Sequence, residues 1–142
     1  MAHLKIDRGA STAFIDLIAE YETSLPEDLR HGSLEPFAVA FTASVDEQPC
    51  GCVALDERDS ATGIIKRLYV RPAFRQHGVA RALIDELVAA ARERGYARVV
   101  LDTDRERLAA AYKFYLLYGF TECAPYVEAV SYVCPTFMEL PL

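Results

Sequence analysis

The residues most able to bind a ligand lie around one glycine, Gly78, between a strand-like run and a helix-like run. The strand-like run ends at Pro72, and an amphipathic helical pattern begins at Gly78. The first backbone N–H groups of a helix have no intrahelical partner, and the helix dipole favours negative charge there. Segment 64–82 has no Asp or Glu, and its cations are Lys66, Arg67, Arg71, Arg75 and Arg81. In a chain of net charge −6, this pattern predicts a ligand that carries phosphate.

Two widespread phosphate-binding motifs do not match this loop. The dinucleotide fingerprint needs G-x-G-x-x-G, and the Walker loop needs G-x-x-x-x-G-K-[ST]. The sequence here is Arg75-x-x-Gly78-x-Ala80. Small residues at positions 78 and 80 would let a pyrophosphate approach the backbone without meeting a side chain.

This pattern resembles the [RQ]-x-x-G-x-[GA] motif of the GNAT superfamily of acetyltransferases. Ala111-x-x-Phe114-Tyr115-x-x-x-Gly119-Phe120 is similar to the family's second signature. Residues 66–72 resemble the family's fourth strand and the turn after it, residues 101–103 its fifth strand, and residues 137–140 its last strand. The resemblance covers nearly the whole chain and is tightest from Ile64 to Phe120.

Apolar spacing and turn residues predict the order of elements independently. The expected elements are a strand at 4–7, a helix from Ser11 or Thr12 to about Thr23, a short helix at 26–31, strands at 37–45, 49–55 and 62–70, a helix at 78–94, a strand at 99–101, a helix at 105–118, and strands at 120–127 and 130–140. This order matches the GNAT fold. We therefore expect one α/β (α+β) domain over residues 1–142 with a mixed, mostly antiparallel sheet of about six to seven strands and about four helices on both faces. The resemblance adds a splay between the fourth and fifth strands.

The resemblance implies acetyl-CoA as the acyl donor, with its diphosphate at the loop and its pantetheine arm in the splay. Backbone groups of the fourth strand would pair with that arm as an added strand would. The expected cofactor-binding residues are Leu68, Tyr69, Val70, Arg75, Gln76, His77, Gly78, Val79, Ala80 and Arg81. We interpret His77 as an anion contact or an exposed residue, not as a base.

The implied reaction is direct transfer of acetyl to a primary amine, of a small molecule or of a protein, in a ternary complex. A backbone N–H near Leu68 or Tyr69 would hold the developing oxyanion. Tyr115 is the expected catalytic general acid for the departing thiolate, since a thiol has a pKa of about 8.5 by analogy with cysteine. The alternative is that Tyr115 is a core aromatic. Tyr112, one turn earlier, is expected to pack.

The general base stays open. An alkyl amine with a pKa of about 10.4 must lose a proton before it attacks. Asp102 at the end of the fifth strand is one candidate, although a solvated or capping role is the alternative. Glu22, Glu57 and Glu128 are further candidates, and a water chain is another route.

Three positions depart from the family's usual pattern. Gln76 stands where Gly is frequent, Leu108 where Asn often contacts the pantetheine arm, and Ile64 where related sequences often carry Glu. These departures keep an alternative function open, a catalytically weak acyl-CoA-binding or regulatory module. An acidic protein-interaction domain without a cofactor is a third hypothesis.

Composition excludes several other classes of function. A pI near 5.0 argues against nucleic acid as a partner, and the acidic balance mildly favours a cationic acceptor. No apolar run approaches the roughly 20 residues of a membrane span, and no signal-peptide pattern appears, so a cytoplasmic protein without a membrane partner is expected. Cys50-Gly51-Cys52 lacks the spacing of a metal site, and no metal is expected.

The acceptor is expected to bind at 10–32 and 123–135, where Tyr21, Tyr126 and Tyr132 are candidate pocket residues. Many members of the family are dimers, so a homodimer is possible, although no specific interface signal is present.

Overall fold

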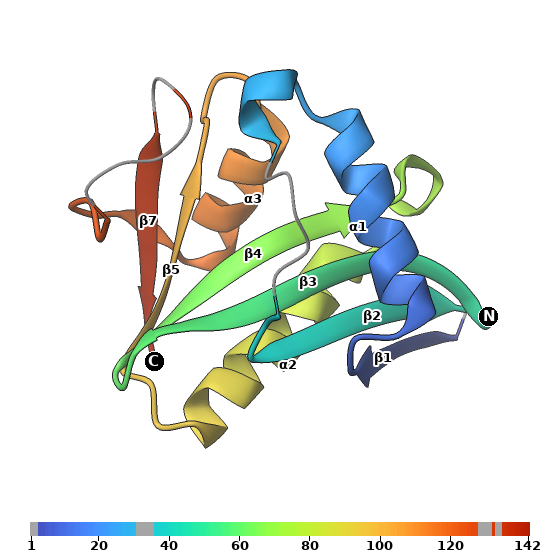
Figure 1. Cartoon of the computed structure of the whole chain (residues 1–142), viewed down its shortest axis with the longest axis horizontal. Helices are drawn as coiled ribbons and strands as arrows, with labels where there is room; N and C mark the ends of the chain where they lie inside the picture. The colour runs from blue at the N-terminus through green and yellow to red at the C-terminus, as the bar shows by residue number, and fades with distance from the viewer. Residues whose placement is uncertain (1–2, 31–35, 128–131, 133–134) are drawn as a thin grey trace.

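The strands form one seven-stranded sheet within the residues that the structure, a computed structural model, describes: 3–30, 36–127, 132 and 135–142. The strand order is β1-β2-β3-β4-β5-β7-β6, and every neighbouring pair is antiparallel except β4 and β5 (Figure 1). The strands are β1 (Leu4–Arg8), β2 (Val39–Val45), β3 (Gln48–Asp59), β4 (Thr62–Val70), β5 (Arg98–Thr103), β6 (Thr121–Glu122) and β7 (Thr136–Pro141). The mixed, mostly antiparallel sheet expected from the sequence is confirmed.

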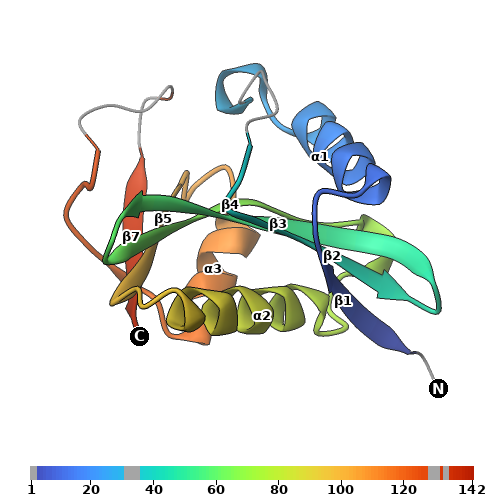
Figure 2. The same cartoon turned by 60° about the horizontal axis from the view of Figure 1, so that its bottom comes forward.

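Helices cover both faces of this sheet, as expected. Figure 2 shows α1 (Thr12–Ser24) on one face, with α2 (Val79–Glu93) and α3 (Ala109–Tyr118) on the other. Two short 3-10 helices, η1 (Glu27–Leu29) and η2 (Pro72–Phe74), complete the helices of the described residues. None of these helices is both long and apolar enough to cross a membrane.

The apolar spacing of each long helix explains which side it buries. Leu83, Ile84 and Leu87 of α2 are fully buried in the main core beneath the sheet. Phe14 and Leu17 of α1 belong to a second cluster, on the opposite face. Because each helix has one apolar stripe, the sheet between them is buried on both faces over its central strands.

A β-bulge interrupts β4 in the middle of the sheet. Tyr69 pairs with Cys52 and Lys66 with Ala54, so the β4 side has one extra residue in this interval. Arg67, inside the bulge, has a left-handed φ of 59°. β4 pairs with β5 only from Thr62 to Ile64. The two strands therefore part after Ile64, ahead of the bulge, which is the expected splay.

Several element boundaries differ from the prediction. The helix expected at 105–118 begins only at Ala109, because Leu108 has non-helical angles, φ −114° and ψ 46°. Before it, the N–H groups of Glu106 and Arg107 donate to the Asp104 carboxylate in a separate turn. The short helix expected at 26–31 is the 3-10 helix η1, within 26–30 of the described residues. The strand expected at 120–127 is reduced to β6, and the last strand begins at Thr136. Positions 31, 128–131, 133 and 134 lie outside the described residues.

Candidate active site

A cavity of about 410 Å³ lies where β4 and β5 part. Its wall consists of residues 64–68 of β4, residues 101–103 of β5, Leu108, Ala111 and Tyr115 at α3, Tyr21 of α1, Leu29, Arg30, Tyr126, Val127 and Tyr132. Leu101 and Tyr115 belong to the core on the α2 face, whereas Tyr126 packs in a cluster with Ile64. Since Tyr21 comes from α1 on the other face, the cavity reaches both faces of the sheet.

Tyr115 is both a core aromatic and a wall residue of the cavity. Its side chain is 6% exposed, and its ring meets those of Phe114 and Phe120 edge to face. Burial raises the pKa of its phenol far above the ordinary value, and the nearby Tyr21 and Asp102 raise it further. The phenol therefore stays protonated at neutral pH, as a general acid must. Tyr112 instead donates to Glu122 at 2.7 Å.

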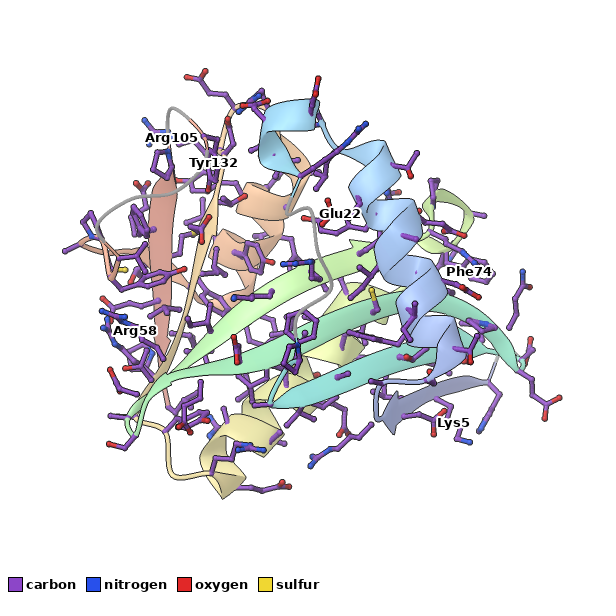
Figure 3. The ribbon with its side chains drawn as sticks, in the orientation of Figure 1. Lys5, Glu22, Arg58, Phe74, Arg105 and Tyr132 are labelled. Atoms are coloured by element: carbon purple, nitrogen blue, oxygen red, sulfur yellow. The ribbon has the colours of Figure 1, made fainter. Side chains whose placement is uncertain are left out.

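Asp102 is the carboxylate in the cavity wall. It accepts hydrogen bonds from the phenols of Tyr126, at 3.0 Å, and Tyr132, at 2.7 Å. All three tyrosines expected in the acceptor pocket, Tyr21 included, line the cavity. In Figure 3, Tyr132 lies at the upper left, near β5, and Glu22 lies near the middle, beside α1.

The other candidate bases are placed differently. Glu22 lies beside the bulge, with its Oε1 3.5 Å from Nε of Arg67. Glu57 accepts a hydrogen bond from the Tyr96 phenol at 2.6 Å. It is not among the described residues of the cavity wall. Glu128 lies outside the described residues.

The loop between β4 and α2 is bent by two left-handed residues. Gln76 has φ 64° and Gly78, the N-cap of α2, has φ 81°. Gln76, His77 and Gly78 are exposed, and the first turn of α2 has no acidic residue. The helix start therefore has the geometry and the charge of an anion site.

The cations of segment 64–82 fall into two groups. Lys66, Arg67 and Arg71 form ion pairs with Asp56, Glu22 and Glu20, respectively. Arg75 and Arg81 are exposed beside the start of α2. Nε of Arg75 donates to the Val70 carbonyl at 2.8 Å, and Arg81 lies over the ring of Tyr118.

Arg67 is a cavity residue that sequence reasoning did not assign to the acceptor side. Arg67 was grouped with the cations of the loop, but the bulge carries it to the α1 face, against Glu22 and Phe37. A bulge has no signal in a run of strand-forming residues. Arg30, which follows η1 in the segment 10–32 expected at the acceptor, also lines the cavity, although no motif singles it out.

No group of His, Cys, Asp and Glu in the described part of the chain is arranged to hold a metal ion. The groups that line the cavity are instead phenols, cations, aliphatic side chains and one carboxylate. These groups suit an organic ligand.

The sequence profile of the Acetyltransferase (GNAT) family matches residues 7–120. The chain belongs to this family. Membership supports acyl transfer as the general chemistry. An uncharacterized N-acetyltransferase of Bacillus subtilis (strain 168), YsnE, is 29% identical over 136 residues, which cover 89% of this chain and 90% of that protein.

Two solved structures with the same fold superpose on almost the whole of this chain. The putative acyl-CoA N-acyltransferase of Klebsiella pneumoniae superposes with a TM-score of 0.83 at 26% identity, over 100% of this chain and 98% of that one. A GNAT family acetyltransferase of Elizabethkingia anophelis with acetyl-CoA bound has a TM-score of 0.69 at 18% identity, over 98% of each chain.

Proposed function

We propose that the protein transfers the acetyl group of acetyl-CoA to a primary amine by direct attack in a ternary complex. One observation carries the proposal: a cavity between the parted strands β4 and β5 reaches both faces of the sheet. A donor and an acceptor that enter from opposite faces would meet in such a cavity. Acetyl-CoA bound to the Elizabethkingia relative supports the same donor here.

The α2 face would hold the donor. The diphosphate would lie at the start of α2, bound by N–H groups of residues 76–81 and by the exposed Arg75 and Arg81. The loop fits this group, because Gly78 has no side chain and a Cβ there would project into open space. The β4 edge from Leu68 to Val70, which has no pairing with β5, would pair with the pantetheine arm.

The chain's own groups would assist transfer at two atoms of the thioester. A backbone N–H near Leu68 or Tyr69 would donate to the carbonyl oxygen as negative charge develops on it. The amine nitrogen would bond to the carbonyl carbon as the carbon–sulfur bond breaks, and the proton that the nitrogen loses would pass to solvent water. The Tyr115 phenol, kept protonated by its burial, would donate to the departing sulfur.

Three side chains favour a second candidate, a catalytically weak acyl-CoA-binding or regulatory module. Ile64 and Leu108 line the cavity as aliphatic groups, and Gln76 occupies a left-handed position that suits glycine. Such a protein would bind acetyl-CoA without passing acetyl to an amine.

One assay separates the two candidates. Free thiol released from acetyl-CoA is followed with a panel of primary amines, and the acetylated product is identified by mass. We expect amine-dependent thiol release and a product heavier by one acetyl group. Thermal stabilisation by acetyl-CoA without turnover of any amine would instead favour the binding module. If acetyl-CoA neither stabilises the protein nor reacts, both candidates are wrong.

A further inference from the structure

We propose that the acceptor is a small amine that also carries a carboxylate, and that Arg67 binds this carboxylate. The inference rests on the proposed function, because it names the acceptor of the same cavity. It differs from the cationic acceptor that the net charge of the chain mildly favours, because the acceptor would carry an anionic group as well.

The charge of the cavity wall differs in sign from that of the chain. Among its described residues, Arg30, Lys66 and Arg67 are cationic and Asp102 is acidic. The whole chain has a net charge of −6. Asp56 and Glu22, which are not part of the wall, pair with Lys66 and Arg67. The wall therefore offers directed guanidinium N–H groups to an anionic group, and its described carboxylate to an ammonium, and not a strong net positive charge.

The backbone brings the Arg67 side chain to this wall at a cost. The residue has a φ of 59° and is 4% exposed. Left-handed conformations are unfavourable for residues other than glycine, and they persist where the surroundings impose them, often at ligand sites. Bulges similarly redirect side chains near active sites.

The contacts of the Arg67 guanidinium orient it. It lies over the ring of Phe37, 5.5 Å from the centroid, and its Nε is 3.5 Å from Oε1 of Glu22. A guanidinium offers five N–H donors on different edges, so one such group can contact two carboxylates. Its planar fork matches a carboxylate better than an ammonium of lysine does.

The order of groups along the cavity sets the direction in which an acceptor would lie. Arg67 lies on the α1 face beside Glu22, whereas Tyr115 belongs to the core on the α2 face, and both line the same cavity as Asp102. A carboxylate at Arg67 would therefore direct the amine of the same molecule toward Asp102 and Tyr115. The proposed transfer takes place there.

Binding to the unmodified protein tests this inference without turnover. The protein is saturated with coenzyme A and titrated by calorimetry with a series of α- and ω-amino acids and with the carboxamide of each. The carboxamide keeps the size and the amine but lacks the negative charge. We expect at least one acid to bind about tenfold or more tightly than its carboxamide. Equal binding of every pair, or no binding of any acid, would overturn the inference.

Variants then assign the preference to Arg67. Arg67→Met should reduce the acid-to-carboxamide ratio to within about threefold, and Arg67→Lys should retain part of it, because the charge remains. Arg98→Met is the matched control, since Arg98 pairs with Glu139 and is not in the cavity wall. Coenzyme A binding reports whether each variant is folded.

A ratio unchanged in folded Arg67→Met would show that another group binds the carboxylate. If Arg67→Met does not fold, Arg67→Lys decides: an unchanged ratio overturns the assignment, and a reduced ratio supports it.

The same series separates this inference from the proposed function. Acid-selective binding without thiol release from acetyl-CoA would uphold the carboxylate site and refute acetyl transfer. Equal acetylation of acids and of amines that lack a carboxylate would uphold transfer and refute the site.

Discussion

Glu20 on α1 binds Arg71, the residue that follows β4, through two short contacts. Nη2 of Arg71 lies 2.7 Å from Oε1 of Glu20, and Nε lies 2.9 Å from Oε2. The third edge of the guanidinium donates to the Pro49 carbonyl at 2.7 Å. The charge of Arg71 is therefore balanced by a carboxylate, whereas the neighbouring Arg75 contacts a backbone carbonyl and an aromatic ring.

This difference predicts unequal effects of two arginine substitutions on acetyl-CoA affinity. Arg75→Gln should weaken affinity about fivefold, because it removes a cation exposed beside the proposed diphosphate site. Arg71→Gln should change the affinity for acetyl-CoA by less than about twofold, because Glu20 already balances the charge of Arg71. Calorimetric titration measures both, and the Arg75 effect should shrink in 1 M NaCl, where the screening length is about 3 Å. Equal effects of the two substitutions would contradict this assignment.

Two glycines with nearly the same φ offer a test of the diphosphate site. Gly78 and Gly95 have φ values of 81° and 79°, and a Cβ at either would meet nothing within 4 Å. Gly78→Glu and Gly95→Glu should each lower the free energy of unfolding by about 1–2 kcal/mol. Only Gly78→Glu should weaken acetyl-CoA binding, by about 100-fold or more, because it adds bulk and negative charge at the start of α2. Wild-type affinity in Gly78→Glu would refute the site.

Removal of the Tyr115 phenol oxygen tests the general acid. Tyr115→Phe should lower kcat by about 100-fold, the lower end of what proton transfer contributes. The acetyl-CoA dissociation constant should stay nearly unchanged, since the ring still fills the core. Tyr112→Phe is the control, because that phenol contacts Glu122 at the surface, and it should leave kcat unaltered. An unaltered rate in Tyr115→Phe would show that another group protonates the thiolate.

The left-handed backbone of Gln76 predicts that a glycine at this position stabilises the protein. Its φ of 64° costs about 1–2 kcal/mol for a residue with a side chain. Gln76→Gly would remove this strain but make the unfolded chain more flexible, by about 0.4–1 kcal/mol. The free energy of unfolding should rise by about 0.5–1 kcal/mol in urea titrations. Gln48→Gly in strand β3 should lower it by a similar amount, and a loss of stability in both variants would contradict the role assigned to strain.

The lowered pKa of Asp104 predicts that the stability of the protein depends on pH. Hydrogen bonds from the Arg107 backbone and side chain hold its pKa below the ordinary value of 3.8. A carboxyl with a lowered pKa in the folded state stabilises the protein above its unfolded pKa, and this contribution disappears as pH falls through the lower folded pKa. Asp104→Asn should therefore lower Tm at pH 7, and the gap from the wild type should narrow below pH 3.8. A gap that is constant from pH 7 to pH 3 would exclude a charge effect.

Local patterns in the sequence were enough for the helix that opens the proposed donor site. The apolar spacing predicted a helix at 78–94, and α2 spans Val79–Glu93. Short-range spacing defines such a helix because its buried stripe and its end signals all lie within the same segment. The next helix was predicted four residues too early, since Leu108 has a non-helical backbone that the apolar spacing does not reveal.

The sequence by itself determined the family, the order of helices and strands along the chain and the loop that would bind an anion, because each depends on neighbours in the chain. Only the tertiary structure decided which acidic and basic side chains pair with each other and which face the cavity. Glu20 and Arg71 are 51 residues apart, and Tyr132 and Asp102 are 30 apart. The bulge that turns Arg67 toward α1 depends on the pairing of β4 with β3. Such contacts arise only when distant segments pack together, so no local pattern specifies which cation faces the donor and which faces the acceptor.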